Sequence, residues 1–82
     1  MTKMNVVKAA LYAIKNWKLI QESQTAGCYS CLKIIPVSEI KRTTDKGQTA
    51  ICPLCDCDTL IPDSLTELNN EYLKEVREYW IG

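Results

Sequence analysis

The chain contains two short cysteine turns, Cys28-Tyr29-Ser30-Cys31 and Cys52-Pro53-Leu54-Cys55, with twenty residues between them. A Cys-x-x-Cys turn directs two sulfurs to one point, because backbone amides fold around metal-bound thiolates. Two such turns complete a tetrahedron of thiolate ligands, and their spacing is typical of four-cysteine zinc sites. We therefore predict one structural zinc ion, bound by Cys28, Cys31, Cys52 and Cys55.

Other interpretations of the five cysteines stay open at this stage. Iron fits any four-thiolate site, since ligand softness and geometry do not separate it from zinc. Two disulfides would require an oxidising compartment, and a redox dithiol would require only one pair in a strand–helix context. Cys57, two residues after Cys55, is a cramped alternative ligand. We expect it instead to be a small, half-buried residue near the site.

The predicted metal site is closed. A catalytic zinc ion generally has three protein ligands and keeps one position for water, whereas four thiolates leave no such position. The chain also contains no histidine, which excludes histidine-based nucleophilic catalysis and Cys/His zinc fingers. The sequence therefore predicts a protein that is not an enzyme.

Length and composition favour a single small domain over residues 1–82. A chain of 82 residues has a thin core, so a metal that joins distant segments is a useful stabiliser. Nearly half of the residues are hydrophobic and the formal net charge is zero, which predicts no general attraction to nucleic acid or membranes. No apolar run is long enough to span a bilayer or form a signal core, so we expect a cytoplasmic protein without a membrane segment.

Hydrophobic periodicity predicts the elements around the cysteines. Spacings of three and four predict an N-terminal helix over residues 5–20, within an N-terminal segment 1–21. Residues 21–27 are expected to be a polar connector. A zinc-bound core over residues 26–62 is expected to contain strands at 32–35 and 58–61, and a helical turn or bend at 36–40. Asp45-Lys46-Gly47 predicts a turn that joins strands 41–44 and 48–51 into a hairpin.

The C-terminal segment 64–81 is again helical in pattern. Ser64-Leu65-Thr66-Glu67 has the form of a capping box, while Asn69 is an alternative cap for a shorter helix. We expect the two terminal helices to pack on each other and on the hairpin, because neither apolar stripe is stable in water. A homodimer built from the same stripes is the rival arrangement. The stripes are Val7, Leu11, Ile14 and Trp17 in one helix and Leu68, Tyr72, Val76 and Trp80 in the other.

The chain resembles a family of small bacterial cytoplasmic zinc-binding proteins that look like zinc-ribbon or treble-clef modules. The resemblance covers about residues 26–81 and rests on the cysteine turns, Gly47-Gln48-Thr49-Ala50-Ile51, Asp58-Thr59-Leu60-Ile61 and the terminal Tyr79-Trp80. It implies zinc at the four paired cysteines, no catalytic residue, and an α+β fold with a β-hairpin core between an N-terminal and a C-terminal helix. Two positions depart from the family pattern: Asp56 replaces glycine and Cys57 replaces an aliphatic residue.

Two functional hypotheses follow. The first is a zinc-stabilised module that recognises a protein partner, because so small a domain cannot bury all of its aromatic residues and exposed aromatics favour recognition. The second is a nucleic-acid-binding zinc ribbon that contacts phosphates through Lys33, Lys41, Arg42 and Lys46. The neutral net charge and the acidic C-terminal helix count against the second hypothesis.

Overall fold

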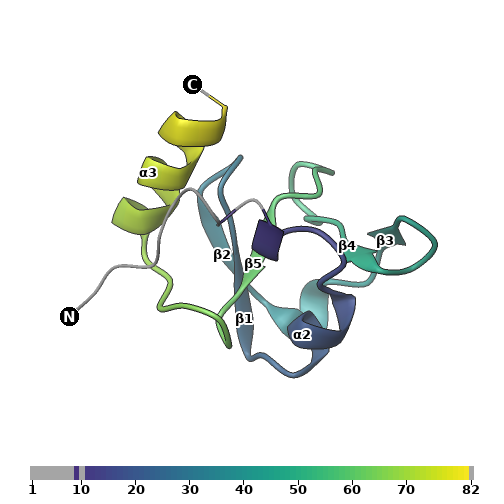
Figure 1. The fold of residues 1–82 in the computed structure, drawn as a ribbon. Coiled ribbons are helices and arrows are strands. Elements are labelled where there is room, and N and C mark those ends of the chain that lie inside the picture. The colour runs from purple at the N-terminus through teal and green to yellow at the C-terminus, as the bar shows by residue number, and fades with distance from the viewer. Residues whose placement is uncertain (1–8, 10, 82) are drawn as a thin grey trace.

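The computed structural model describes residue 9 and residues 11–81 of the chain. Two antiparallel sheets and flanking helices confirm the predicted α+β class (Figure 1). In chain order the elements are α2 (Trp17–Gln21), β1 (Thr25–Cys28), β2 (Lys33–Pro36), the 3₁₀ turn η1 (Val37–Glu39), β3 (Thr43–Thr44), β4 (Thr49–Ala50), β5 (Leu60–Pro62) and α3 (Asn70–Trp80).

The larger sheet has the strand order β2-β1-β5, so β1 is its central strand. Both neighbours are antiparallel to β1, and Gly27 lies opposite Ile34 on one side and Ile61 on the other. The expectation of a polar connector over residues 21–27 is therefore wrong for its second half. Thr25, Ala26 and Gly27 are too small to give a hydrophobic strand pattern, yet Ala26 and Gly27 are buried and paired on both sides, and Thr25 is paired with β2.

The absence of a side chain at Gly27 lets α3 approach β1 closely. A Cβ atom on Gly27 would lie 3.1 Å from both Cδ atoms of Leu73 in α3, and 3.3 Å from Leu68 Cδ2. Glycine at this position therefore provides the space that the Leu73 side chain fills. The central strand has no side chain at this position, and the larger side chain of Leu73 is buried there instead.

The predicted hairpin is present as β3 and β4. Thr43 lies opposite Ala50, and Thr44 lies opposite Thr49. The turn between the strands has positive φ angles at Asp45, Lys46 and Gly47. The neighbouring predictions also hold, with small shifts at the ends: strands occur as β2 and β5, and a single helical turn occurs as η1.

The predicted N-terminal helix is interrupted. Residues 5–8 and 10 of its predicted range, which include Val7 of the apolar stripe, lie outside the described residues. Ala9, Leu11 and Tyr12 are helical, but residues 13–16 break the helix, and Lys15 has a φ of 50°. The predicted apolar stripe is wrong at Leu11 and Ile14, whose side chains are 63% and 46% exposed. A continuous helix over residues 5–20 is therefore not formed.

The break is explained by Asn16, whose side chain is almost fully buried. Its Nδ2 donates hydrogen bonds to Tyr12 O at 2.9 Å and Leu60 O at 2.7 Å. Its Oδ1 accepts a hydrogen bond from Ala50 N at 3.1 Å. One side chain thus ends the first helical segment and ties it to both sheets, which an exposed helical asparagine could not do.

The C-terminal helix begins at Asn70, not in the predicted capping box at Ser64-Leu65-Thr66-Glu67. Asn69 is the N-cap, and its Oδ1 accepts a hydrogen bond from Tyr72 N at 2.8 Å, as the alternative interpretation proposed. Ser64 instead exchanges hydrogen bonds with the Ser23 hydroxyl. Residues 63–66 are consequently used as a turn that returns the chain from β5.

Two clusters of buried side chains lie on opposite faces of the larger sheet. One holds Leu60 with α2, η1, the hairpin and two cysteines, and the other holds Ile61 with α3 and the N-terminal residues Ala9 and Ala13. The N-terminal segment therefore shares a core with α3, as expected, but through Ala9, Tyr12 and Ala13 and not through the predicted stripe. Trp17 packs on the other cluster, and Trp80 is 44% exposed.

Within residues 9 and 11–81, no helix is both long and apolar enough to cross a lipid bilayer.

We predict that Asn16→Ala lowers the free energy of unfolding by about 3 kcal/mol or more, because Leu60 O and Ala50 N would be buried without these partners. Gln21→Ala, at an exposed position of α2, is the control and should change it by less than about 0.5 kcal/mol. Urea unfolding followed by circular dichroism measures both values. Equal effects of the two substitutions would show that Asn16 does not join the segments.

Candidate metal centre

The two cysteine turns have the same backbone geometry. Leu32 N–H donates to Cys28 O at 2.8 Å, and Asp56 N–H donates to Cys52 O at 2.9 Å. The residue that follows each turn is left-handed, with φ of 64° at Leu32 and 62° at Asp56. The two turns therefore share one backbone hydrogen bond and one left-handed residue, and both direct their two sulfurs toward the same point.

The sequence-predicted ligands Cys28, Cys31, Cys52 and Cys55 come together at one point, where they could hold a metal ion. Their four Sγ atoms all lie within 4.8 Å of one another. Two separations across the pairs are 3.5 Å for Cys28–Cys55 and 3.8 Å for Cys31–Cys52. A tetrahedron with metal–sulfur bonds of about 2.3 Å has edges of about 3.8 Å, so the cluster has the right size.

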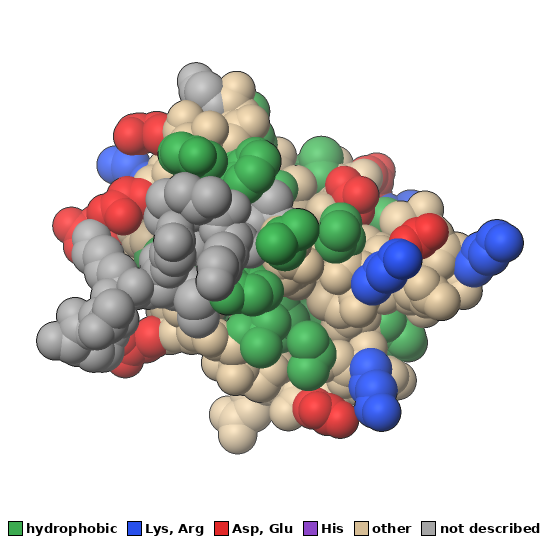
Figure 2. Space-filling model, in the orientation of Figure 1, with side chains coloured by type: hydrophobic (Ala, Val, Ile, Leu, Met, Phe, Trp, Pro, Cys, Tyr) green, Lys and Arg blue, Asp and Glu red, His purple; other side chains and the backbone are tan. Residues whose placement is uncertain are grey.

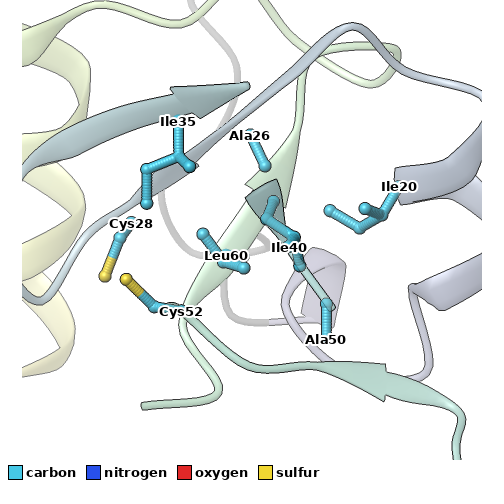
Figure 3. Packing of buried hydrophobic residues seen from close by; sticks show 8 residues of the cluster. All are labelled: Ile20, Ala26, Cys28, Ile35, Ile40, Ala50, Cys52 and Leu60. Carbon is cyan, nitrogen blue, oxygen red and sulfur yellow. The ribbon is translucent and has the colours of Figure 1, made fainter. Parts of the chain in front are cut away.

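The cluster is part of the hydrophobic core. Cys28 and Cys52 are fully buried, and Cys31 and Cys55 pack against the same core as half-buried side chains. Figure 3 shows the sulfurs of Cys28 and Cys52 turned toward each other at the edge of the packed side chains. A cation held here would link β1, the turn before β2 and the turn after β4.

Electrostatics favour a cation at this point. Burial raises the pKa of Cys31 and Cys52, and the nearby Cys28 sulfur raises both further. Burial also disfavours the Cys28 thiolate, but the Thr59 hydroxyl at 3.0 Å and backbone N–H groups reverse this and lower the pKa of Cys28. Cys28 is therefore the more easily ionised of these three sulfurs, while Cys31 and Cys52 ionise readily only when a cation offsets their burial and the charge of Cys28.

The sequence missed two features of the site. Thr59 gives no signal in the sequence, since a hydroxyl next to a strand is common. Leu32 is equally unmarked because leucine rarely has a positive φ, whereas aspartate, as at Asp56, adopts it more readily than most residues. Asp56 also forms an ion pair with Arg42, and both side chains are exposed. The departure from glycine at position 56 is therefore accommodated.

Cys57 lies beside the cluster but outside it. Its Sγ is 3.5 Å from Cys55 O and 3.9 Å from the Ser30 hydroxyl. Among the described residues, the metal-competent group contains the other four cysteines and not Cys57. Its half-buried position is the one expected from the sequence.

The four basic residues of the nucleic-acid hypothesis are exposed, but they come from different elements. Lys33 is in β2, opposite Cys28. Lys46 is in the β3–β4 turn, and Arg42 forms an ion pair with Asp56.

Comparison of the chain with protein-family models, curated proteins and solved structures finds no match, so the family resemblance stays a prediction.

We predict that the purified native protein contains one metal ion per chain and that Cys52→Ser removes both the metal and cooperative unfolding. A structural zinc ion contributes roughly 10 kcal/mol of folding energy, more than the total stability of most small domains. Cys57→Ser is the matched control and should keep full stoichiometry. Elemental analysis with thermal unfolding decides, and loss of metal from the Cys57 variant alone would refute the ligand assignment.

We also predict that Asp56→Ala is less stable than Asp56→Gly by about 1 kcal/mol, because only alanine keeps a Cβ atom at a positive φ. Both substitutions remove the ion pair with Arg42, so the difference between them isolates the backbone term. Denaturant unfolding of the metal-loaded variants measures it. Equal stabilities would mean that residue 56 does not hold this conformation in solution.

Proposed function

We propose that this chain is a non-enzymatic, zinc-stabilised module that recognises a protein partner. The observation that carries the proposal is the convergence of four buried or half-buried cysteine sulfurs within 4.8 Å, built into the core of a small domain. Such a site supports a structural metal, and zinc is the preferred ion for four thiolates in a closed tetrahedron. Iron is the other ion that this ligand set would accept.

A structural role for the metal is also supported by the chemistry around it. All four tetrahedral positions have a cysteine ligand available, and the chain has no histidine to act as a base nearby. Thiolates that surround a zinc ion give the cluster a net negative charge, which opposes formation of a metal-bound hydroxide. We therefore assign the function to surfaces of the domain, and the role of the metal is to stabilise the fold that presents them.

One apolar surface lies at the end of α3. It consists of Tyr79, Trp80 and Ile81, whose side chains are 56%, 44% and 51% exposed. The two aromatic rings meet edge to face, with centroids 5.2 Å apart. Figure 2 shows hydrophobic side chains gathered over α3. Exposed aromatic side chains that are fixed by a helix are characteristic of protein-binding surfaces.

The test is affinity capture with the metal-loaded protein and a Tyr79→Ser/Ile81→Ser variant. We expect a specific partner to bind the native protein and to bind the variant at least about tenfold more weakly, as for loss of interface anchors. Ile34→Ser, at a site 42% exposed on β2, is the control and should retain binding. A partner lost equally from both variants would contradict the assignment of this surface.

The alternative is a nucleic-acid-binding zinc ribbon that uses Lys33, Lys41, Arg42 and Lys46. It is less well supported because the net charge is zero and Arg42 is already paired with an acid. Affinity that falls steeply with salt concentration and is lost in Lys41→Glu/Lys46→Glu would favour it over the protein-binding proposal.

A further inference from the structure

A second candidate site lies between α2 and the β3–β4 turn, away from α3 (Figure 1). It is a pocket of about 310 Å³ lined by Lys15, Trp17, Lys18, Gly47 and Gln48. This volume is at the lower end of the range for ligand pockets and is sufficient for one large side chain. None of the metal ligands contributes to it.

The two walls of the pocket are joined by hydrogen bonds. Trp17 N–H donates to Gln48 O at 2.9 Å, and Lys15 N–H donates to Thr49 Oγ1 at 2.8 Å. Between these positions, buried Asn16 holds Ala50 N through its side chain. The pocket is therefore formed in advance, and a ligand would not have to order either wall.

The lining combines an apolar surface with positive charge. Trp17 is half-buried because its side chain packs on the core cluster that contains Ile20 and Leu60. Lys15 and Lys18 are exposed on either side of it in the sequence, and no acidic residue lines the pocket. The backbone of Lys15 has a φ of 50°, a left-handed conformation that glycine or asparagine would adopt at a lower cost in free energy.

We propose that this pocket binds an acidic peptide segment of a protein partner, with one apolar or aromatic side chain placed against Trp17. Aspartate or glutamate residues next to that side chain would face Lys15 and Lys18. The inference rests on the proposed function in that the ligand is a protein, but it concerns a site separate from the surface at the end of α3.

A peptide fits this pocket better than a nucleic acid strand. Single-stranded nucleic acids bind to positively charged grooves that follow several phosphates and offer successive stacking surfaces. This pocket offers one aromatic ring and two lysines, in a chain whose net charge is zero. A peptide that places one apolar side chain against Trp17 and has a few acidic residues next to it matches that arrangement.

The chain contains two tryptophans, so Trp80→Phe makes Trp17 the sole indole reporter. The probes are short synthetic peptides in which a single Phe, Leu or Met is flanked by Asp and Glu. Matched peptides carry Ser in place of the apolar residue or Lys in place of the acids, and an oligothymidine represents nucleic acid. Tryptophan emission is measured on the metal-loaded protein at low salt.

We expect a saturable change in Trp17 emission with at least one acidic, apolar-anchored peptide and none with its Ser or Lys version. Lys15→Glu/Lys18→Glu should weaken this binding about tenfold or more, because both charge contacts become repulsive. Lys74→Glu, at an exposed position of α3, makes a comparable charge change elsewhere and should leave binding within about twofold. Circular dichroism verifies that each variant is folded.

Three results would overturn the proposal: no saturable response to any anchored peptide, equal binding of the Ser peptides, or stronger binding of the oligothymidine. The proposed function can fail separately. If Tyr79→Ser/Ile81→Ser loses its partner but binds the peptides normally, both sites exist. If it retains its partner while the Lys15→Glu/Lys18→Glu variant loses it, the α2 pocket is the recognition site.

Discussion

Four cysteine sulfurs that converge within 4.8 Å impose the constraint on which the rest of the structure depends. Burial raises the pKa of Cys31 and Cys52, so these two sulfurs carry charge readily only when a cation is bound beside them. The backbone contributes here, because each cysteine turn closes with its own hydrogen bond, and the four sulfurs are close enough together to hold a metal ion. The turns bring the end of β1 and the segment after β4 to one point, and the two sheets are joined there.

Asn16 provides a second junction between the same two sheets, close to the cysteines, because Leu60 pairs with Cys28 and Ala50 lies two residues before Cys52. It links the N-terminal segment to β5 through Leu60 O and to β4 through Ala50 N. The hairpin is therefore attached at the end of β4 by the buried Asn16 amide at Ala50 and, two residues later, by the second cysteine turn. A two-residue ladder such as β3–β4 would be marginal by itself, and these two attachments explain how it persists.

The cysteine turns, the hairpin and the buried face of α3 could be predicted from the sequence because each depends on local chemistry. Three local features of the sequence agree with the structure: the spacing of the cysteines, the Asp45-Lys46-Gly47 turn, and the helical spacing of Tyr72 and Val76. The central strand β1 could not be predicted in this way, because its Gly27 leaves space for Leu73, a residue distant in sequence. The same holds for the helix break, since Asn16 gains its hydrogen bonds only when β4 and β5 are present.

The candidate site shows the same division between local and distant signals. Its four predicted residues come together, whereas Thr59 and the left-handed Leu32 become visible only when the chain is folded. The exposed side chain of Ile14 follows from the same cause, because Ile14 lies in the break that Asn16 ends, where the predicted apolar face does not continue. The same break brings Lys15 and Trp17 against the hairpin turn. A polar residue that disrupts a regular element thus creates the pocket between α2 and the hairpin, because an uninterrupted helix would lack the backbone bonds from Lys15 and Trp17 that form its walls.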